Sequence, residues 1–256
     1  MSVKWVLSMA AVLTVFMILR AGAQVADAEI DVEKLIREID TLYRSESSYA
    51  ELEMEIVTPD WQRTLVMKSW TRGMDKTFIR ITSPLKERGV ATLRIENEMW
   101  NFLPKTNKVV KVPPSMMMSS WMGSDFTNDD LVKEFSLFKD YTYELLEPPD
   151  GAADLYYINC IPHEGLPIVW GNIVIAVRRD GRLPVWQKYY DEKGNLMREM
   201  TYAEVKKFGD RLVPSVMEMA PATREGHKTI FRYRDVRFNV AVDDAVFSLR
   251  NLQSRE

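Results

Sequence analysis

The stretch from Trp70 to Val112 constrains the fold most, because it consists of short segments that each carry the pattern of a β-strand. Lys76–Ser83 is rich in β-forming Thr, Phe and Ile, and Val90–Glu96 alternates apolar and polar side chains. Further segments at Met99–Leu103 and Val109–Val112 follow after short polar turns. A period of two places the apolar side chains of a strand on one face, and short turns join antiparallel neighbours. The stretch therefore predicts a meander of antiparallel strands with one apolar face.

This strand pattern stops at Pro113-Pro114, because proline cannot donate a hydrogen bond to a sheet. The segment that follows, Met116–Met122, has no clear period, and we call it the methionine loop. It holds Met116, Met117, Met118, Trp121 and Met122. Methionine side chains are flexible and adapt to apolar partners of different shape. The loop therefore has two interpretations that do not exclude one another: a plug that packs into the mouth of a curled sheet, or a lid or sliding contact for an apolar ligand such as an acyl chain.

The rest of the chain also predicts a mainly β (α+β) protein. Helical spacing predicts a first helix at Asp31–Ser45 and a short one at Thr127–Phe138, where Thr127 and Asp130 have the spacing of a capping box. The remaining strands are expected at Ala50–Thr58, Gln62–Thr71, Tyr141–Leu146, Leu155–Ile161, Asn172–Arg179, Leu183–Tyr190, Leu196–Lys206, Leu212–Ala220 and His227–Phe238. No linker or low-complexity tract divides the chain. We therefore expect one domain built on a curling antiparallel sheet of about eleven strands.

An ordered set of short motifs runs from Arg72 to Leu131. It comprises Arg72-Gly73, Lys76 with Phe78 and Arg80 before Ser83-Pro84, Lys86 with Gly89, Leu93, Trp100 with Leu103-Pro104, and Met122-Gly123-Ser124-Asp125-Phe126 before Asp130-Leu131. In these motifs the chain resembles the LolA-like family of periplasmic outer-membrane lipoprotein-sorting proteins. The resemblance implies a half-open antiparallel β-barrel that helices close on one side, a cavity for acyl chains, and no catalytic residues.

The apolar face of the meander and the methionine loop supply the candidate lipid-binding residues. On physical grounds alone, alternating apolar residues are more often the filled core of a sheet. Two short helices, however, cover little of a large curved sheet, and the resemblance adds the expectation of an open cavity. The predicted set is Leu52, Met54, Ile56, Leu65, Met67, Ile79, Ile81, Leu93, Ile95, Trp100, Met117, Met118, Trp121 and Met122.

The first residues have the layout of a secretory signal peptide. Lys4 precedes an apolar run of 14 residues, Val6–Leu19, and small residues follow at Ala21-Gly22-Ala23. A membrane-spanning helix needs about 20 apolar residues, which makes this run short for one. We expect residues 1–23 to be the signal peptide and residues 24–256 the exported domain, with cleavage after Ala23 or Ala28. An uncleaved anchor stays open as an alternative, because Arg20 is an unusual residue just after an apolar core.

Charge and cysteine content exclude some classes of protein. The net charge is −3 at pH 7, and removal of residues 1–23 would take away the positive charges of Lys4 and Arg20. An acidic chain with scattered basic residues is not typical of a nucleic-acid-binding protein. The single cysteine, Cys160, cannot form a disulfide within the chain. The sheet and its core must therefore stabilise the fold alone.

No set of residues indicates catalysis, a metal or a cofactor. Cys160 and His163 lack a third residue to orient or complete a site. Asp125, Thr127 and Asp129 begin a calcium-loop spacing, but the required glycine and the final glutamate are missing, so a helix cap is the better interpretation. The sequence also lacks the G-x-S-x-G and H-E-x-x-H motifs. We therefore expect a protein that is not an enzyme.

These observations lead to a periplasmic carrier as the main hypothesis. Such a protein would hold the acyl chains of a lipid or lipoprotein in an apolar cavity between the inner and the outer membrane, and would touch membranes only peripherally. Burial of acyl chains contributes about 25 cal/mol per Å², and we expect a lining without specific polar contacts. The resemblance implies an ABC-type permease complex of the inner membrane as partner. The alternative is a lipid-sensing regulatory or assembly module that binds an envelope protein and does not shuttle.

Overall fold

The computed structural model describes residues 30–132, 136–149, 154–166 and 168–254. Asp31–Glu256 forms one compact unit. The predicted signal peptide and both predicted cleavage sites lie outside the described residues. Within the described ranges, no helix is both long and apolar enough to span a bilayer.

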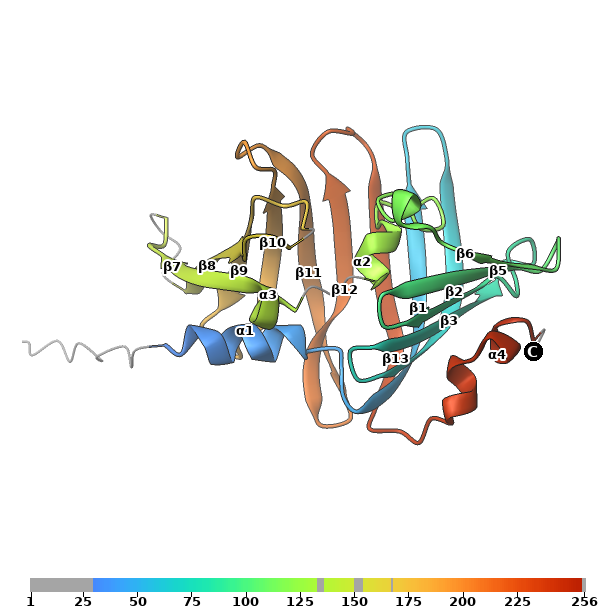
Figure 1. The fold of residues 1–256 in the computed structure, drawn as a ribbon. Coiled ribbons are helices and arrows are strands. Elements are labelled where there is room, and N and C mark those ends of the chain that lie inside the picture. Colours follow the sequence, from blue (N-terminus) through green and yellow to red (C-terminus); the bar gives the residue numbers. More distant parts are fainter. Residues whose placement is uncertain (1–29, 133–135, 150–153, 167, 255–256) are drawn as a thin grey trace, which may run out of the picture. The chain divides into compact units, whose positions relative to one another are not determined.

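One antiparallel sheet of thirteen strands makes up most of the fold, in the order β6-β5-β4-β3-β2-β1-β13-β12-β11-β10-β9-β8-β7 (Figure 1). The strands are β1 (Ser47–Val57), β2 (Gln62–Arg72), β3 (Lys76–Ser83), β4 (Ala91–Ile95), β5 (Glu98–Leu103), β6 (Lys108–Lys111), β7 (Tyr141–Leu146), β8 (Leu155–Pro162), β9 (Asn172–Arg178), β10 (Pro184–Tyr190), β11 (Leu196–Phe208), β12 (Arg211–Pro221) and β13 (Lys228–Phe238). The predicted class and the antiparallel meander are confirmed. The sheet has more strands than the expected number of about eleven, and each of them overlaps a segment that the sequence predicts as a strand, down to the short β6.

The sheet consists of two meanders that the last strand joins. Every neighbouring pair is consecutive in sequence except β1 and β13, which pair antiparallel from Ser48↔Phe238 to Val57↔Lys228. The register of this pair shifts between Glu51 and Leu52, and a similar shift interrupts β9 and β10 near Pro184. Such bulges bend strands and increase their twist. The result is an open, curved sheet with a concave face.

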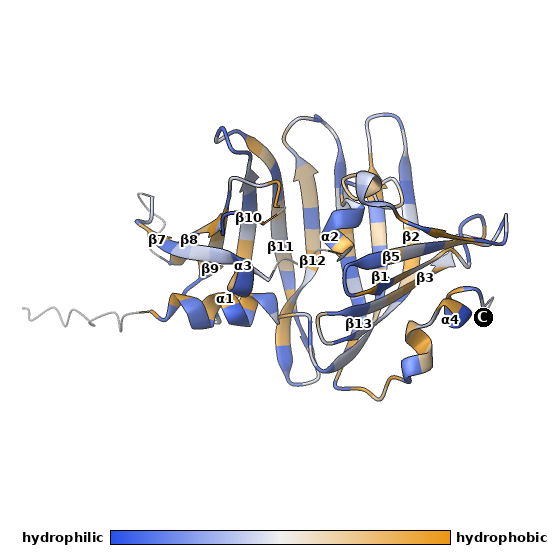
Figure 2. Cartoon of the chain, in the orientation of Figure 1, coloured by the Kyte–Doolittle hydropathy of each residue, from blue (hydrophilic) through white to orange (hydrophobic). Residues whose placement is uncertain are grey.

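Short helices accompany the sheet: α1 (Val32–Asp40), η1 (Pro114–Met116), α2 (Asn128–Val132), α3 (Leu137–Asp140), η2 (Asp244–Phe247) and α4 (Leu249–Leu252). The Asp31 carboxylate accepts a hydrogen bond from the Lys34 amide at 2.9 Å and so caps α1. Figure 2 shows apolar and polar residues alternating along α1, and Leu35, Ile36 and Ile39 are its buried residues. The helix is amphipathic as predicted from the spacing.

Helix α1 is shorter than predicted, since it ends at Asp40 and not at Ser45. Asp40 and the residues after it form hydrogen bonds with distant parts of the chain. The Asp40 carboxylate accepts hydrogen bonds from the backbone amides of Leu137 and Phe138, at the start of α3, and Arg211 donates to the carbonyl of Arg44 at 2.6 Å. These contacts hold the residues that follow α1, and Arg44 lies outside the helix.

The predicted second helix divides into α2 and α3 in the described residues, and residues 133–135 between them are not described. Its predicted capping box is present. The Thr127 amide donates to Asp130 at 2.7 Å, and the Asp130 amide donates to the Thr127 hydroxyl at 3.1 Å. Asp130 thus takes part in the cap of α2, and its carboxylate also bonds to β11, as described below.

The two faces of β2–β6 are covered by different parts of the chain. The C-terminal segment packs on one face, where Phe247 and Leu252 form a cluster with Phe78, Leu93 and Phe102. Ile79 has the opposite parity to Phe78 and turns to the concave face. In Figure 1, α2 lies in front of the middle of the sheet, whereas α4 lies at its lower edge.

Candidate functional site

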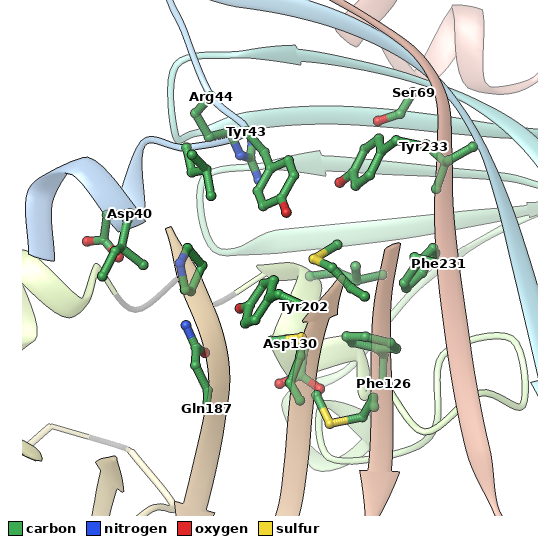
Figure 3. Close-up of a pocket in the computed structure, with 18 of the residues that line it drawn as sticks. Asp40, Tyr43, Arg44, Ser69, Phe126, Asp130, Gln187, Tyr202, Phe231 and Tyr233 are labelled. Carbon is green, nitrogen blue, oxygen red and sulfur yellow. The ribbon is translucent and has the colours of Figure 1, made fainter. Parts of the chain in front are cut away.

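The concave face encloses a cavity of about 380 Å³. That volume lies within the range of roughly 300–1,000 Å³ that is usual for small-molecule sites. Its walls come from the end of α1, from β1–β3, from β9–β13, and from the segment between the methionine loop and β7. Figure 3 shows Arg44 and Ser69 toward one side of this cavity and Phe126 and Asp130 toward the other.

Some of the predicted lipid-binding residues line this cavity. They are Leu52, Met67, Ile79 and Trp121. Leu52 and Met67 lie opposite one another in the β1–β2 ladder, and Ile79 pairs with Ser69, another lining residue, in the β2–β3 ladder. Three neighbouring strands thus contribute to one wall, as the alternation of apolar residues predicts.

The other predicted residues lie elsewhere. Met54, Ile56, Leu65 and Ile81 are buried but are not among the cavity's lining residues. Leu93, Ile95 and Trp100 pack in the cluster with Phe247 and Leu252, because Leu93 pairs with Phe78 and so shares its face and not that of Ile79. The expectation that Leu93 and Ile95 share a face with Ile79 is therefore wrong. Met117, Met118 and Met122 do not line the cavity either, and a lipid-binding role for all these residues stays a prediction.

The second meander supplies a wall that the predicted set does not include. Met200, Met217, Met219 and Phe231 line the cavity together with Tyr202 and Tyr233. Met200 pairs with Met219, and Tyr202 pairs with Met217, across β11 and β12. The alternation Met200, Tyr202 within Leu196–Phe208 is the sequence signal that could have identified this wall.

The lining is also more polar than expected. Tyrosines at positions 43, 141, 189, 202 and 233, two arginines and two aspartates contribute to it. The Tyr43 ring stacks on the Tyr233 ring with centroids 5.1 Å apart, and its hydroxyl donates to the Pro214 carbonyl at 2.8 Å. Burial raises the pKa of the Tyr189 hydroxyl to about 12, so this group stays neutral. The cavity therefore combines apolar surface with hydrogen-bonding groups.

A buried ion pair crosses from α2 to β11. Arg198 donates to both carboxylate oxygens of Asp130, at 2.6 and 2.8 Å, and its guanidinium lies 4.5 Å from the centre of the Trp170 ring and 4.4 Å from that of Tyr189. Burial by itself would raise the pKa of Asp130, but the hydrogen bonds and the charge of Arg198 hold it below its usual range. The pair fixes α2 against the far wall of the cavity.

The methionine loop is attached to the sheet at several points. The Trp121 indole donates to the Thr92 hydroxyl at 3.2 Å, and the Arg63 guanidinium donates to the Met122 carbonyl. Just after the loop, the Asp125 carboxylate accepts from the Thr229 hydroxyl at 2.7 Å. In contrast, the side chains of Met116 and Met118 are half exposed. The loop thus turns Trp121 inward and these two methionines outward.

The arrangement gives no support to a catalytic or metal site. Burial raises the pKa of the Cys160 thiol to about 12, which keeps it unreactive at neutral pH. Among the described residues, no group of three or more His, Cys, Asp or Glu is placed to hold a metal ion. What the cavity can do chemically is enclose an apolar chain and hydrogen-bond a polar group.

Solved structures of similar fold agree with this description. A DUF1329 family protein from Desulfovibrio piger is 26% identical, with a TM-score of 0.76 over 86% of this chain and 97% of that chain. A putative outer membrane lipoprotein-sorting protein domain from Vibrio parahaemolyticus is 21% identical, with a TM-score of 0.72 over 87% and 96% of the two chains. A LolA superfamily protein from Nitrosomonas europaea is 17% identical, with a TM-score of 0.72 over 87% and 99%.

A family model described as "uncharacterized protein" matches residues 73–254, which is more than half of the chain. The chain belongs to this family. Its fold is LolA-like, and the predicted resemblance is confirmed. A search of curated proteins gave no match. In this LolA-like protein the concave cavity is the candidate functional site.

Proposed function

We propose that this LolA-like protein is a periplasmic carrier that binds the acyl chains of a lipid or lipoprotein in its concave cavity and transfers them from the inner toward the outer membrane. The observation that carries the proposal is the cavity of about 380 Å³ between the two meanders, with its methionines and aromatic residues. Flexible methionines adapt to chains of different shape. The fold that the chain shares with a lipoprotein-sorting domain supports the same role.

Transfer requires binding that is reversible. Each buried methylene of a chain contributes about 0.8 kcal/mol, and the cavity encloses only part of a lipid. Release to an acceptor is then compatible with stable transport through water. We further propose an inner-membrane ABC-type permease complex as the donor of the cargo.

The binding step is tested with a fluorescent fatty acid and the purified protein. We expect saturable binding near one probe per chain, and displacement by a lysolipid. The sharpest variant is Ser69→Phe, which places a ring inside the cavity, because Ser69 lines it. Its matched control is Lys68→Phe, because the neighbouring residue on a strand points to the opposite face and the Lys68 side chain is partly exposed there, beside Glu51.

Loss of probe binding in Ser69→Phe with normal binding in Lys68→Phe supports the cavity as the site. Melting temperatures of both variants are measured in parallel, because overfilling a packed site costs about 1–3 kcal/mol. Absence of saturable binding by the unmodified protein would contradict the proposal and would indicate that the cavity is only imperfectly filled core.

A further inference from the structure

The concave face of β1–β3 changes character from one end to the other. Ser48 pairs with Thr71, and Thr71 pairs with Thr77, so three hydroxyl side chains form one row across the strands. All three line the cavity and are at least nine-tenths buried. Three adjacent hydroxyl groups are unusual on a face whose remaining rows are largely apolar, and we call them the hydroxyl row.

The next two rows on the same face are increasingly apolar. Two residues further along each strand, Ala50 pairs with Ser69 and Ser69 with Ile79; two residues further again, Leu52 pairs with Met67. Rows two residues apart are separated by roughly 7 Å, from the rise of a β-strand. The cavity wall therefore runs from a polar end to an apolar end over about 14 Å.

Arg44 adds positive charge to the polar end. It lines the cavity, and its guanidinium donates to the Thr77 hydroxyl at 3.4 Å. Arg94 pairs with Thr77 in the β3–β4 ladder and so lies beside the end of the hydroxyl row. Burial, and next the nearby Arg94, lower the pKa of Arg44 to about 10, so Arg44 remains charged at neutral pH. A bound anion beside Arg44 would offset both the burial of its charge and the repulsion from Arg94.

The hydroxyl row has protons to donate. The Ser48 and Thr71 hydroxyls share one hydrogen bond, and in such a pair one of the two protons is left for another acceptor. Thr77 accepts from Arg44, which leaves its own proton free for donation. A guanidinium carries five N–H donors, so Arg44 can bind a ligand while it keeps its contacts with the protein.

The carboxylates that line the cavity are bound to other groups. Asp130 is held by Arg198 through two hydrogen bonds. Asp40 accepts from the Ser136 hydroxyl and from two backbone amides of α3. The polar end therefore presents donors and positive charge to the cavity, and Figure 3 shows Arg44, Tyr43 and Ser69 on that side, away from Phe126.

We propose that Arg44 and the hydroxyl row bind the anionic oxygens of an amphiphile, a carboxylate or a phosphate, while its chain lies along Ala50, Leu52 and Met67. This inference rests on the proposed function and adds a headgroup subsite to it. The orientation follows directly, since the charged group lies at the Arg44 end and the chain extends toward the methionines of β11 and β12. The cavity would then select anionic over neutral amphiphiles of equal chain length.

The test compares ligands that differ only in the headgroup. Dodecanoate, dodecyl phosphate and dodecanol compete with the fluorescent probe for the protein at pH 8. We expect dodecanoate or dodecyl phosphate to bind about tenfold more tightly than dodecanol, because charge-assisted hydrogen bonds are stronger than neutral ones. The tighter of the two anions identifies whether the subsite favours a carboxylate or a phosphate.

Two variants assign the preference to the proposed residues. Arg44→Gln and Thr77→Val are expected to reduce the preference for the anions and to leave dodecanol affinity unchanged. The matched control is Arg182→Gln, which removes a guanidinium that pairs with Glu38 outside the cavity. Arg44→Lys, which retains the charge, is expected to keep part of the preference, and this distinguishes loss of charge from a general disturbance of the fold.

Equal affinity for dodecanoate, dodecyl phosphate and dodecanol would overturn the headgroup subsite while leaving the proposed carrier function intact. A preference that persists in Arg44→Gln would overturn the assignment to Arg44. If none of the three ligands displaces the probe, both the subsite and the proposed function fail. These outcomes therefore separate failure of the headgroup subsite from failure of the proposed carrier function.

Discussion

Two groups of methionines in this protein have opposite surroundings. Met116 and Met118 in the methionine loop are 51% and 47% exposed and do not line the cavity. Met67 and Met219 on the strands are at most 1% exposed and, with Met200 and Met217, form cavity walls. The density of methionines in a sequence therefore does not locate the cavity. Their placement on alternating strand positions does so better, because that placement points them at the enclosed space.

The loop itself is held by Trp121, and removal of that side chain should have the largest effect. Trp121 is 2% exposed and bonds to Thr92. Trp121→Ala should lower the free energy of unfolding by about 3–5 kcal/mol, as is typical for a buried Trp. Chemical denaturation measures this loss. The control Trp61→Ala removes a half-exposed Trp and should change it by less than about 0.5 kcal/mol. Similar small effects for both would mean that the loop is loosely attached.

The next largest effect is expected at the ion pair that joins α2 to the wall. Asp130→Asn leaves the charge of Arg198 buried and should destabilise the fold by about 3 kcal/mol at pH 7. Because the pKa of Asp130 is lowered in the folded state, its contribution is present above the unfolded pKa of about 3.9. It is lost as the pH falls through the folded value. Thermal melting from pH 7 to pH 2 should therefore show the variant and the parent converging in acid; a constant difference would contradict this role.

The wall methionines should matter for binding more than for stability. Met200→Ser with Met217→Ser removes apolar surface that lines the cavity and should weaken fatty-acid binding about tenfold, from the loss of a few buried methylene equivalents. Titration with the fluorescent probe measures the change. Unchanged affinity would mean that the chain lies against other residues.

The loop methionines provide the matched comparison, with the smallest expected effect. Met116→Ser with Met118→Ser changes two half-exposed side chains. It should shift the free energy of unfolding by less than about 0.5 kcal/mol and alter probe affinity by less than twofold. A strong loss of affinity without a loss of stability would instead establish the loop as a movable ligand contact.

Much of the fold was predictable because alternation and turn residues are local signals. The strand segments, the capping box of Thr127 and Asp130, and the cap of α1 at Asp31 all follow from short stretches of sequence. The end of α1 did not follow, because Asp40 binds the amides of Leu137 and Phe138 far along the chain. Local periodicity cannot show that contact.

The site was less predictable, because it depends on register and on which segment covers each face. Leu93 looks like a partner of Ile79 in the sequence, but it pairs with Phe78 and packs under the C-terminal segment. Arg44 comes from the segment between α1 and β1, the hydroxyl row comes from three strands, and no motif links them. The register of the strands aligns the three hydroxyl groups, and the contact of Arg44 with Thr77 adds the charge.

Photolabelling can show directly whether the ligand chain lies between the two meanders, as we propose. A fatty acid with a photoreactive group at the end of its chain is bound, irradiated and mapped by peptide mass spectrometry. We expect labels on cavity residues of β11–β13, such as Met200, Met217 and Phe231, and prior competition by dodecanoate should remove them. Labels confined to Met116–Met118, or to the face covered by Phe247 and Leu252, would contradict this position of the ligand chain.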